Sequence, residues 1–351
     1  MSASIDAPDA SAKLQRVPQR FRKLLLALVI LAALVVVAML AFTNVRPPPR
    51  PPLPIPNGYD DFLTAGAVIT GNLGNYSTID QDALRDLVAA NAEPLRLLRL
   101  GLSRRCSVPT EAALTNYPAL MNSLAGFKGL ALLLAAEGRL AELEKRPADA
   151  ASSYVDAIQL GNEMSRGGFI INRLVGVACA AIGSRPLAKL LPGLTCELAR
   201  PLIVRLEQID AQGVTWDEVL QNENDYTRHE LHKSANPIRW VTAWWQSRLP
   251  RKKWEARHNI EVAHIRLLMT ELSLRCYQAG QGRAPTSLEQ LVPNYLQSVP
   301  LDPFSGQTLV YRSQGTNWLL YSLGTDRVDD GGKPVGRGSE SKGDIFFDSL
   351  W

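Results

Sequence analysis

The chain has 351 residues, of which 46% are hydrophobic and 21% are charged, and its formal net charge is +4. The positive charge lies in residues 1–50, so the rest of the chain has a net charge of −1. This distribution excludes a broadly basic nucleic-acid-binding face, and no nucleic-acid partner is expected. The length is typical of two domains.

A long apolar run follows a small, polar tail over residues 1–20, which we predict to be disordered in the cytoplasm. The run Leu24–Thr43 has 20 residues and no charge, which as a helix spans about 30 Å, the thickness of a bilayer core. A cleaved signal peptide is the alternative, but its apolar region is usually about 7–15 residues long. We therefore predict a transmembrane helix over residues 24–45 that holds the chain in the lipid bilayer.

The charges around this run predict its orientation. Five basic residues precede it, and only Arg46 and Arg50 follow closely. The positive-inside rule then places the N-terminus in the cytoplasm and the remainder on the other side. We expect a single-pass protein of a bacterial inner membrane with its C-terminal domains in the periplasm.

A proline-rich spacer and a helical domain come next. Residues 46–58 hold seven prolines in thirteen positions, which predicts a stiff, extended segment of roughly 35–40 Å. Residues 59–236 show apolar residues at three- and four-residue steps, as amphipathic helices do. Asp80 is a candidate helix cap, and Pro147 suits a first helical turn. Residues 169–191 are apolar on nearly all sides and predict a buried helix.

The helical domain contains a hint of a repeat. Gly138, Ala150, Tyr154 and Ala157 have the spacing of four signature positions of a tetratricopeptide unit. Other signature positions are absent, and no second copy follows at the period of about 34 residues. We predict an antiparallel helical bundle, with a tetratricopeptide-like arrangement as the alternative.

Residues 237–258 are rich in tryptophan and in basic residues, with four of the seven tryptophans. Such a segment suits a flap that touches the membrane or a partner. The alternative is a loop whose tryptophans pack onto the bundle. From Asn259 to Ala279 the pattern predicts another amphipathic helix.

The four cysteines, Cys106, Cys179, Cys196 and Cys276, contain no C-x-x-C spacing, so a zinc ribbon is not indicated. They could pair in an oxidising compartment. Cys179 lies in an apolar run and fits a small core residue.

The C-terminal residues change in character. Thr286 and Glu289 form a T-x-x-E pattern that predicts a capped short helix. The runs "TLVYRS" and "WLLYSLG", joined by "QGTN", predict a hairpin of two strands, and "DIFF" predicts a third. Residues 259–351 are therefore expected to form a small α+β domain with a short antiparallel sheet.

This order of motifs resembles the C-terminal region of the major pseudopilin of bacterial type II secretion. The matching residues are Ala284-Pro285-Thr286, Leu288, Leu291-Val292-Pro293, Tyr295-Leu296, Val299-Pro300-Leu301-Asp302-Pro303, Tyr311, Tyr321-Ser322-Leu323-Gly324, Asp326, Gly331-Gly332 and Asp344-Ile345. The chain itself is not expected to be a pilin. Its first glycine is Gly58 and its first glutamate is Glu93, so the processing glycine and the early glutamate of pilins are missing near the apolar run.

The resemblance implies a structural calcium ion in the loop before the last strand. It points to Asp326 and Asp344 as ligands, with backbone oxygen from Leu323. Asp329 and Asp330 join them as part of the local cluster of carboxylates, which calcium prefers. The family often has an aspartate where this chain has Leu319. The alternative is a solvated acidic turn whose repulsion is softened by Arg327 and Lys333.

The sequence shows no nucleotide-binding loop, no nucleophile elbow and no H-E-x-x-H motif. We therefore predict a mainly α, non-enzymatic envelope protein with a binding or scaffold role, protein partners in the envelope, and a link to a secretion or pilus-like assembly. The alternative is an envelope hydrolase with a metal site at His229, Glu230 and His232, completed by His258 or His264.

Overall fold

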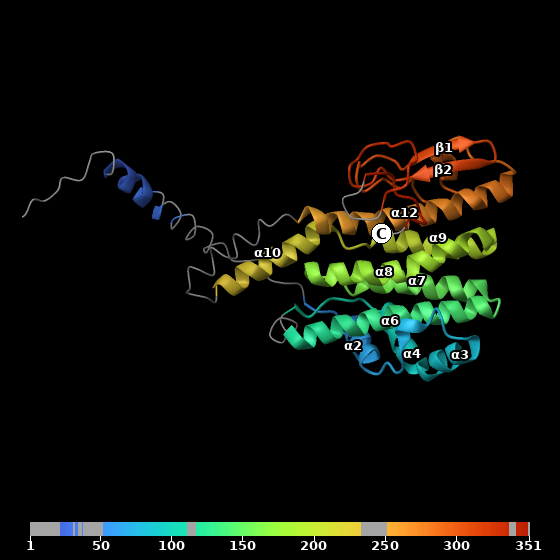
Figure 1. Ribbon diagram of the computed structural model, residues 1–351, viewed down its shortest axis with the longest axis horizontal. Coiled ribbons are helices and arrows are strands. Elements are labelled where there is room, and N and C mark those ends of the chain that lie inside the picture. Colours follow the sequence, from blue (N-terminus) through green and yellow to red (C-terminus); the bar gives the residue numbers. More distant parts are fainter. Residues whose placement is uncertain are drawn as a thin grey trace, which may run out of the picture. The chain divides into compact units, whose positions relative to one another are not determined.

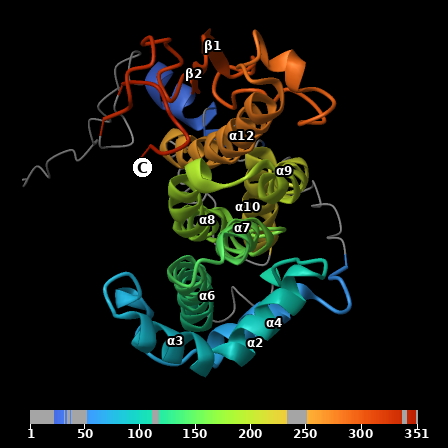
Figure 2. The same ribbon diagram turned by 90° about the vertical axis from the view of Figure 1, so that its right-hand side faces the viewer.

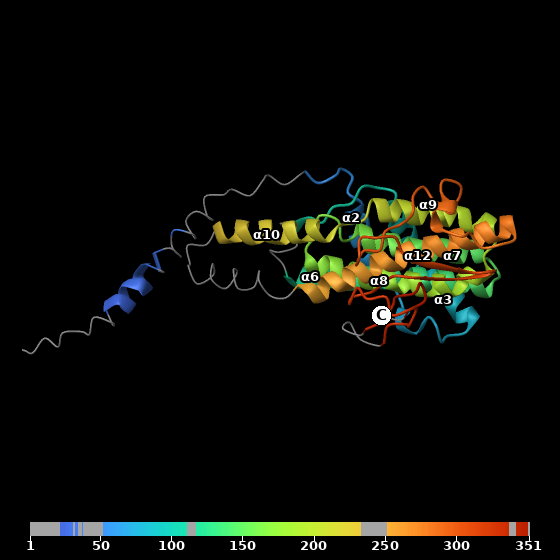
Figure 3. The same ribbon diagram turned by 90° about the horizontal axis from the view of Figure 1, so that it is seen from above.

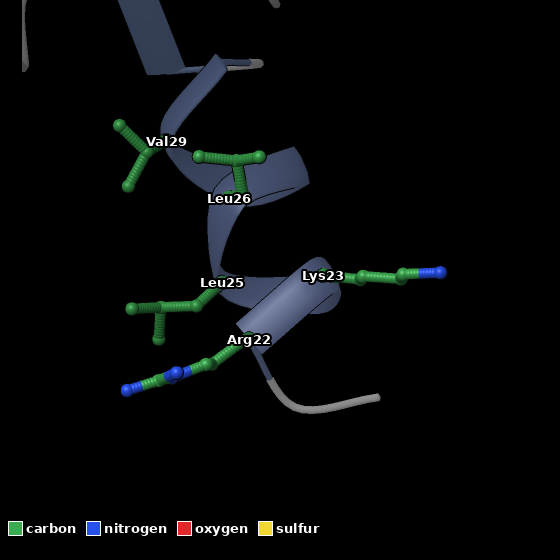
Figure 4. A pocket seen from close by; sticks show the side chains of 5 residues that line it. All are labelled: Arg22, Lys23, Leu25, Leu26 and Val29. Carbon is green, nitrogen blue, oxygen red and sulfur yellow. The ribbon is translucent and has the colours of Figure 1, made fainter. Parts of the chain in front are cut away.

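The structure is a computed structural model that describes residues 22–30, 32–33, 37, 52–110, 117–232, 251–336 and 342–349. Residues 50–226 and 246–351 form one compact unit, called the body here, and residues 1–49 and 227–245 form a second unit. In the second unit residues 22–30 are helical, and Leu25, Leu26 and Val29 project from this helix just after Arg22 and Lys23 (Figure 4). The other described residues of the predicted segment 24–45 are helical as well, and the rest of that segment lies outside the described residues.

The body is mainly helical, as predicted, and it contains a small antiparallel sheet. Its elements, in chain order, are α2 (Gly58–Ala67), η1 (Leu73–Asn75), α3 (Gln81–Ala90), α4 (Ala92–Leu102), α6 (Tyr117–Leu143), α7 (Pro147–Glu163), α8 (Ile170–Leu190), η2 (Leu191–Gly193), α9 (Cys196–Ala211), the start of α10 (Trp216–His232), α12 (Lys252–Gln281), η3 (Leu288–Leu291), β1 (Val310–Gln314) and β2 (Asn317–Tyr321).

Local sequence signals account for several helix ends. Asp80 accepts a hydrogen bond from the backbone N–H of Ala83 at 2.8 Å and so caps α3, as predicted. Pro147 occupies the first turn of α7, where its missing N–H costs nothing. The predicted spacer 46–58 ends earlier than expected, because Asn57 is buried as the cap of α2 and Gly58 begins that helix.

The body is a stack of layers (Figures 1 and 2). Helices α2, α3 and α4 pack on one side of α6, and α6 packs against α7 and α8. Helix α12 contacts both α8 and α9, and the β1–β2 hairpin covers α12. The long helices run along a common direction (Figure 3). The hydrophobic core therefore lies between layers of helices.

Close contacts establish the direction of each helix. A Cβ added to Gly161 of α7 would lie 2.3 Å from the Gly176 carbonyl oxygen of α8, so only glycine allows these antiparallel backbones to approach. A second contact, between Gly183 of α8 and the Tyr154 carbonyl of α7, shows that α7 and α8 are antiparallel. Helices α6 and α7 are joined by only three residues, so α7 turns back along α6 and packs against it. Arg173, near the start of α8, contacts His258 near the start of α12. Helices α6, α8 and α12 therefore begin at one end of the body.

Two hydrophobic clusters share α7. Ala157 and Leu160 face a cluster with α2, α4 and α6. Val155 and Ile158 face a larger cluster that joins α8, α9, α12 and the C-terminal residues as far as Ile345. The C-terminal residues thus share a continuous core with the helices, and no break in packing occurs at the predicted boundary of residue 259.

The C-terminal region contains the predicted hairpin, with Val310 opposite Tyr321 and Gln314 opposite Asn317. The predicted third strand, "DIFF", is not a strand here, since it forms only two isolated bridges, Ile345 with Ser322 and Asp344 with Pro334. The predicted capping box is also wrong. Gln290, rather than Glu289, accepts the Thr286 N–H and donates to the Thr286 hydroxyl.

Cysteine pairing joins two helices of the larger cluster. Cys196 at the start of α9 and Cys276 of α12 form a disulfide, with their Cα atoms 4.9 Å apart. Cys106 and Cys179 are free and buried, and burial raises the pKa of each thiol to about 12. Cys179 is thus a core residue, as its apolar surroundings predicted.

Two helices of the body, Pro118–Leu143 and Ile170–Gly193, are long and apolar enough to cross a membrane by length and composition. About half of each is buried among its neighbours, at 50% and 56%. Such lengths and compositions are compatible with membrane association, and they equally suit the core helices of a globular body.

Candidate functional site

The two best-defined C-terminal motifs meet at one buried carboxylate. Asp302, in the "PLDPFSG" turn, is 1% exposed. Its Oδ1 accepts from the Ser322 hydroxyl at 2.9 Å, and its Oδ2 accepts from the Leu323 N–H at 2.9 Å. Asp302 therefore fastens the turn to the "YSLG" end of β2. Leu323, predicted as a backbone ligand, is held at this junction.

The acidic loop follows this junction. Gly324 has φ 70°, and a Cβ there would lie 2.6 Å from the Gly343 carbonyl oxygen. A side chain would therefore push the loop away from the segment that carries Asp344. Arg327 also has a positive φ of 59°, so the loop turns sharply just before its pair of aspartates.

Two of the predicted ligands are occupied by protein groups. Asp329 accepts from the Tyr321 hydroxyl at 2.7 Å and the Gly331 N–H at 2.9 Å, and it pairs with Arg312 at 2.7 Å. The Tyr321 hydrogen bond, together with Gly331 and Arg312, lowers the pKa of Asp329. Asp326 accepts a long hydrogen bond, 3.3 Å, from the Val328 N–H. Neither carboxylate is aligned here as an obvious metal ligand.

The other two predicted ligands leave carboxylate oxygens without partners. Asp344 is 0% exposed; its Oδ2 accepts from the Gly332 N–H at 2.8 Å, but its Oδ1 has no hydrogen-bond partner. The Oδ2 of Asp330 is likewise buried and without a partner. Buried carboxylate oxygens in native proteins are nearly always satisfied by hydrogen bonds, water or an ion.

The electrostatics of Asp344 agree with this geometry. Burial raises the pKa of its carboxyl group, and the nearby Asp329 and Asp330 raise it further, although N–H groups of Gly332 and Asp330 act in the opposite direction. A hard cation would offset the negative charge of the buried Asp344 carboxylate. Carboxylates in a glycine-rich loop are the kind of ligands that calcium prefers.

No group of three or more His, Cys, Asp or Glu side chains is arranged to hold a metal within the described ranges. A calcium site at this loop would therefore depend on backbone carbonyls and water for most of its ligands, as flexible calcium loops often do.

A second cluster of buried polar groups lies in the helical layers. Arg173 of α8 forms an ion pair with Glu261 of α12, and the two side chains are 2% and 3% exposed. The Nε of Arg173 donates to the Nδ1 of His258 at 2.8 Å, which leaves the proton of this neutral histidine on Nε2. Nη1 of Arg173 and Oε1 of Glu261 have no partners.

The predicted metal alternative gains no support from these histidines. Burial, reinforced by Arg173 and Arg266, lowers the pKa of His258 to about 3. The ring nitrogens of His264 lie 2.8 Å from the Ile260 carbonyl oxygen and 3.3 Å from the Ser349 carbonyl oxygen, and burial lowers its pKa to about 4. The neutral ring has one N–H and so donates to only one of these carbonyls. The side chains of His229, Glu230 and His232 lie outside the described residues.

Neither Asp302 nor Arg173 was assigned a role of its own from the sequence. Asp302 had a usable signal, an aspartate between prolines at a turn, which often accepts local N–H groups. Arg173 also had one, because an arginine in the largely apolar first half of a helix needs a buried partner. Comparison of this chain with family models, curated proteins and solved structures finds no match.

Proposed function

We propose that this chain is a single-pass inner-membrane protein whose body lies in the periplasm and acts as a non-enzymatic binding or scaffold protein. The apolar segment 24–45 supports the anchor, and its basic flank supports the orientation. The Cys196–Cys276 pair fits an oxidising compartment. The antiparallel stack of helices provides the broad surface on which envelope partners would assemble.

We further propose that calcium stabilises the C-terminal region, and the observation that carries this proposal is the pair of unpartnered oxygens on Asp330 and Asp344. Asp344 and Asp330 would be the carboxylate ligands. Leu323 and its neighbours would supply carbonyl oxygens, Asp326 would be a further carboxylate ligand, and Asp329 would stay with Arg312 and Tyr321.

The link to a secretion or pilus-like assembly rests on the resemblance to the pseudopilin C-terminal region. The resemblance is supported by direct contact between two of its motifs, because Asp302 accepts hydrogen bonds from Ser322 and Leu323. The link remains one of likeness, and function is carried by sites rather than by folds.

The test is the thermal stability of the full-length chain in detergent, measured with calcium, with magnesium and with a chelator. We expect calcium to raise the Tm by several degrees, because a ligand that binds only the folded state stabilises it. Asp344→Asn and Asp330→Asn should abolish this increase. Asp86→Asn, an exposed residue of α3, is the matched control and should leave it unchanged. An unaltered Tm in calcium would refute the metal site.

A further inference from the structure

The outer face of the β1–β2 hairpin is in direct contact with the acidic loop through Asp329. We propose that Asp329 is a positioning residue, held by Tyr321 and Arg312 so that the loop keeps Asp330 beside Asp344 and binds calcium tightly. The three residues Arg312, Tyr321 and Asp329 are called the clasp here. The inference rests on the proposed calcium site and names the groups that set its affinity.

The two faces of the hairpin have different partners, since successive side chains of a strand point to opposite faces. Trp318 faces the helices, and its Nε1 donates to Glu271 of α12 at 2.8 Å. Arg312 lies opposite Leu319 in the register and shares the other face with Tyr321. Its guanidinium carbon is 5.8 Å from the centre of the Tyr321 ring. The face turned away from α12 therefore carries the clasp.

The buried hydroxyl of Tyr321 is the stronger of the two holds on Asp329. Tyr321 is 0% exposed, and its hydroxyl donates to Oδ1 of Asp329 at 2.7 Å. A hydrogen bond to an ionised carboxylate is stronger than one between neutral groups. The ion pair of Arg312 with Oδ2 is 2.7 Å long, but its side chains are 48% and 42% exposed, and exposed pairs contribute little. Arg312 is thus a secondary contact.

A chain of contacts leads from the clasp to Asp344. Oδ1 of Asp329 also accepts from the Gly331 N–H at 2.9 Å, and Gly331 and Gly332 have φ values of 74° and 84°. This turn aims the Gly332 N–H at Oδ2 of Asp344, at 2.8 Å. A Cβ on Gly332 would lie 2.8 Å from Cδ2 of Leu319, so the loop lies directly on β2.

The two carboxylate oxygens without partners lie next to this turn and take no part in the clasp. Oδ2 of Asp330 follows Asp329 directly in the chain, and Oδ1 belongs to the fully buried Asp344. Because the clasp orders the turn through protein groups alone, an arriving cation does not have to order it. A site that is ordered in advance binds more tightly than one that must be ordered on binding.

The experiment titrates calcium chloride into the full-length chain in detergent and measures heat. Tyr321→Phe removes the hydroxyl and leaves the local charge unchanged. We expect it to weaken calcium binding about tenfold, as the loss of one hydrogen bond to a charged group implies. Tyr311→Phe is the matched control, because it removes a hydroxyl that donates to the Pro285 carbonyl at 2.6 Å on the other face of the hairpin. It should leave the affinity unchanged.

Substitution of Asp329 separates a positioning role from direct ligation. Asp329→Asn and Asp329→Ala remove the same charge, but only asparagine keeps an oxygen that accepts from Tyr321 and Gly331. We expect the asparagine variant to bind calcium about tenfold more tightly than the alanine variant. In the Tyr321→Phe background this difference should shrink. A difference of the same size in that background would identify Asp329 as a ligand and overturn the inference.

Hydrogen exchange in a chelator tests the clasp without calcium. The amides of residues 326–334 should exchange more slowly in the wild-type chain than in Tyr321→Phe, because the clasp holds the turn. Tyr311→Phe should exchange there at the wild-type rate. Equal rates in the wild-type chain and Tyr321→Phe would show that the clasp does not order the loop.

The titrations also separate this inference from the calcium site on which it rests. If the wild-type chain binds no calcium, the proposed site fails and the inference fails with it. If the wild-type chain binds calcium and Tyr321→Phe binds it equally tightly or more tightly, the calcium site stands and the positioning role of Asp329 alone is wrong.

Discussion

Arg173 and Glu261 form an almost fully buried ion pair between α8 and α12. Both side chains are almost fully excluded from water, and the loss of either partner would leave the other charge buried without compensation. Such losses typically cost about 3–5 kcal/mol, whereas replacement of both charges by apolar groups is often nearly neutral.

We therefore predict that Arg173→Met or Glu261→Met alone destabilises the body by about 3–5 kcal/mol, and that the double variant recovers most of this loss. Urea denaturation of the three variants measures the coupling. Arg96→Met is the control, because its ion pair with Glu93 is exposed. Additive losses in the double variant would show that the two charges act independently.

Asp344 makes a pH-dependent prediction. Its pKa is raised in the folded protein, first by burial, so in the absence of metal its contribution to stability is full below the unfolded value of about 3.9 and is lost as the pH rises through the folded pKa. In a chelator at neutral pH, Asp344→Asn should therefore raise the Tm relative to the wild-type chain, and this gain should disappear at low pH. A lower Tm for the variant at neutral pH would contradict this assignment.

At the scale of elements, the Cys196–Cys276 disulfide holds the start of α9 against α12 and closes a sequence separation of 80 residues. Removal of a native disulfide from a folded domain commonly costs about 2–5 kcal/mol. We predict that dithiothreitol, or Cys196→Ser with Cys276→Ser, lowers the Tm by several degrees. Cys179→Ser, in a chain that keeps the disulfide, should leave the response to dithiothreitol intact. If Cys196 and Cys276 react with maleimide in intact, unreduced cells, the disulfide between them is not formed.

The helices were predictable from sequence to the extent that their signals are local. The cap at Asp80 and the proline at Pro147 mark their helix starts correctly. The start of α12 was placed at residue 259, seven residues late, because the basic stretch before it does not resemble a helix start. The strand predicted at "DIFF" failed because a run of apolar residues does not reveal whether its neighbours offer a continuous ladder or only isolated bridges.

The acidic loop illustrates a limit of sequence reasoning at a site. The sequence shows that four aspartates lie in this region, but it does not show which of them are buried or which have hydrogen-bond partners. Asp329 is satisfied by Arg312 and Tyr321, whereas Asp344 is buried with a free oxygen. These differences arise from contacts between β1, β2 and the last segment, which no spacing within the loop encodes.

At the scale of the whole molecule, the continuous core has consequences for folding. One hydrophobic cluster contains Val155 of α7, Leu206 of α9, Leu272 of α12 and Ile345 near the C-terminus. The helical layers and the C-terminal region therefore depend on the same buried surface, although composition and motif both divide the sequence near residue 259. A fragment that begins within α12 would expose the face that α8 and α9 now cover.

We predict that the body unfolds in a single cooperative transition, because the helical layers and the C-terminal region share one buried cluster. Differential scanning calorimetry of the full-length chain should give equal calorimetric and van't Hoff enthalpies for the main transition. Leu272→Ala in α12 should lower the Tm of the helical and C-terminal signals together, as judged by hydrogen exchange of α7 and of β1–β2. The matched change Leu98→Ala creates a cavity in the other cluster. It tests whether lost packing there also lowers the stability of the α9–α12 cluster through α7, which both clusters share. Two resolved transitions, with α7 protected after β1–β2 has exchanged, would show that the C-terminal region is an independent domain after all.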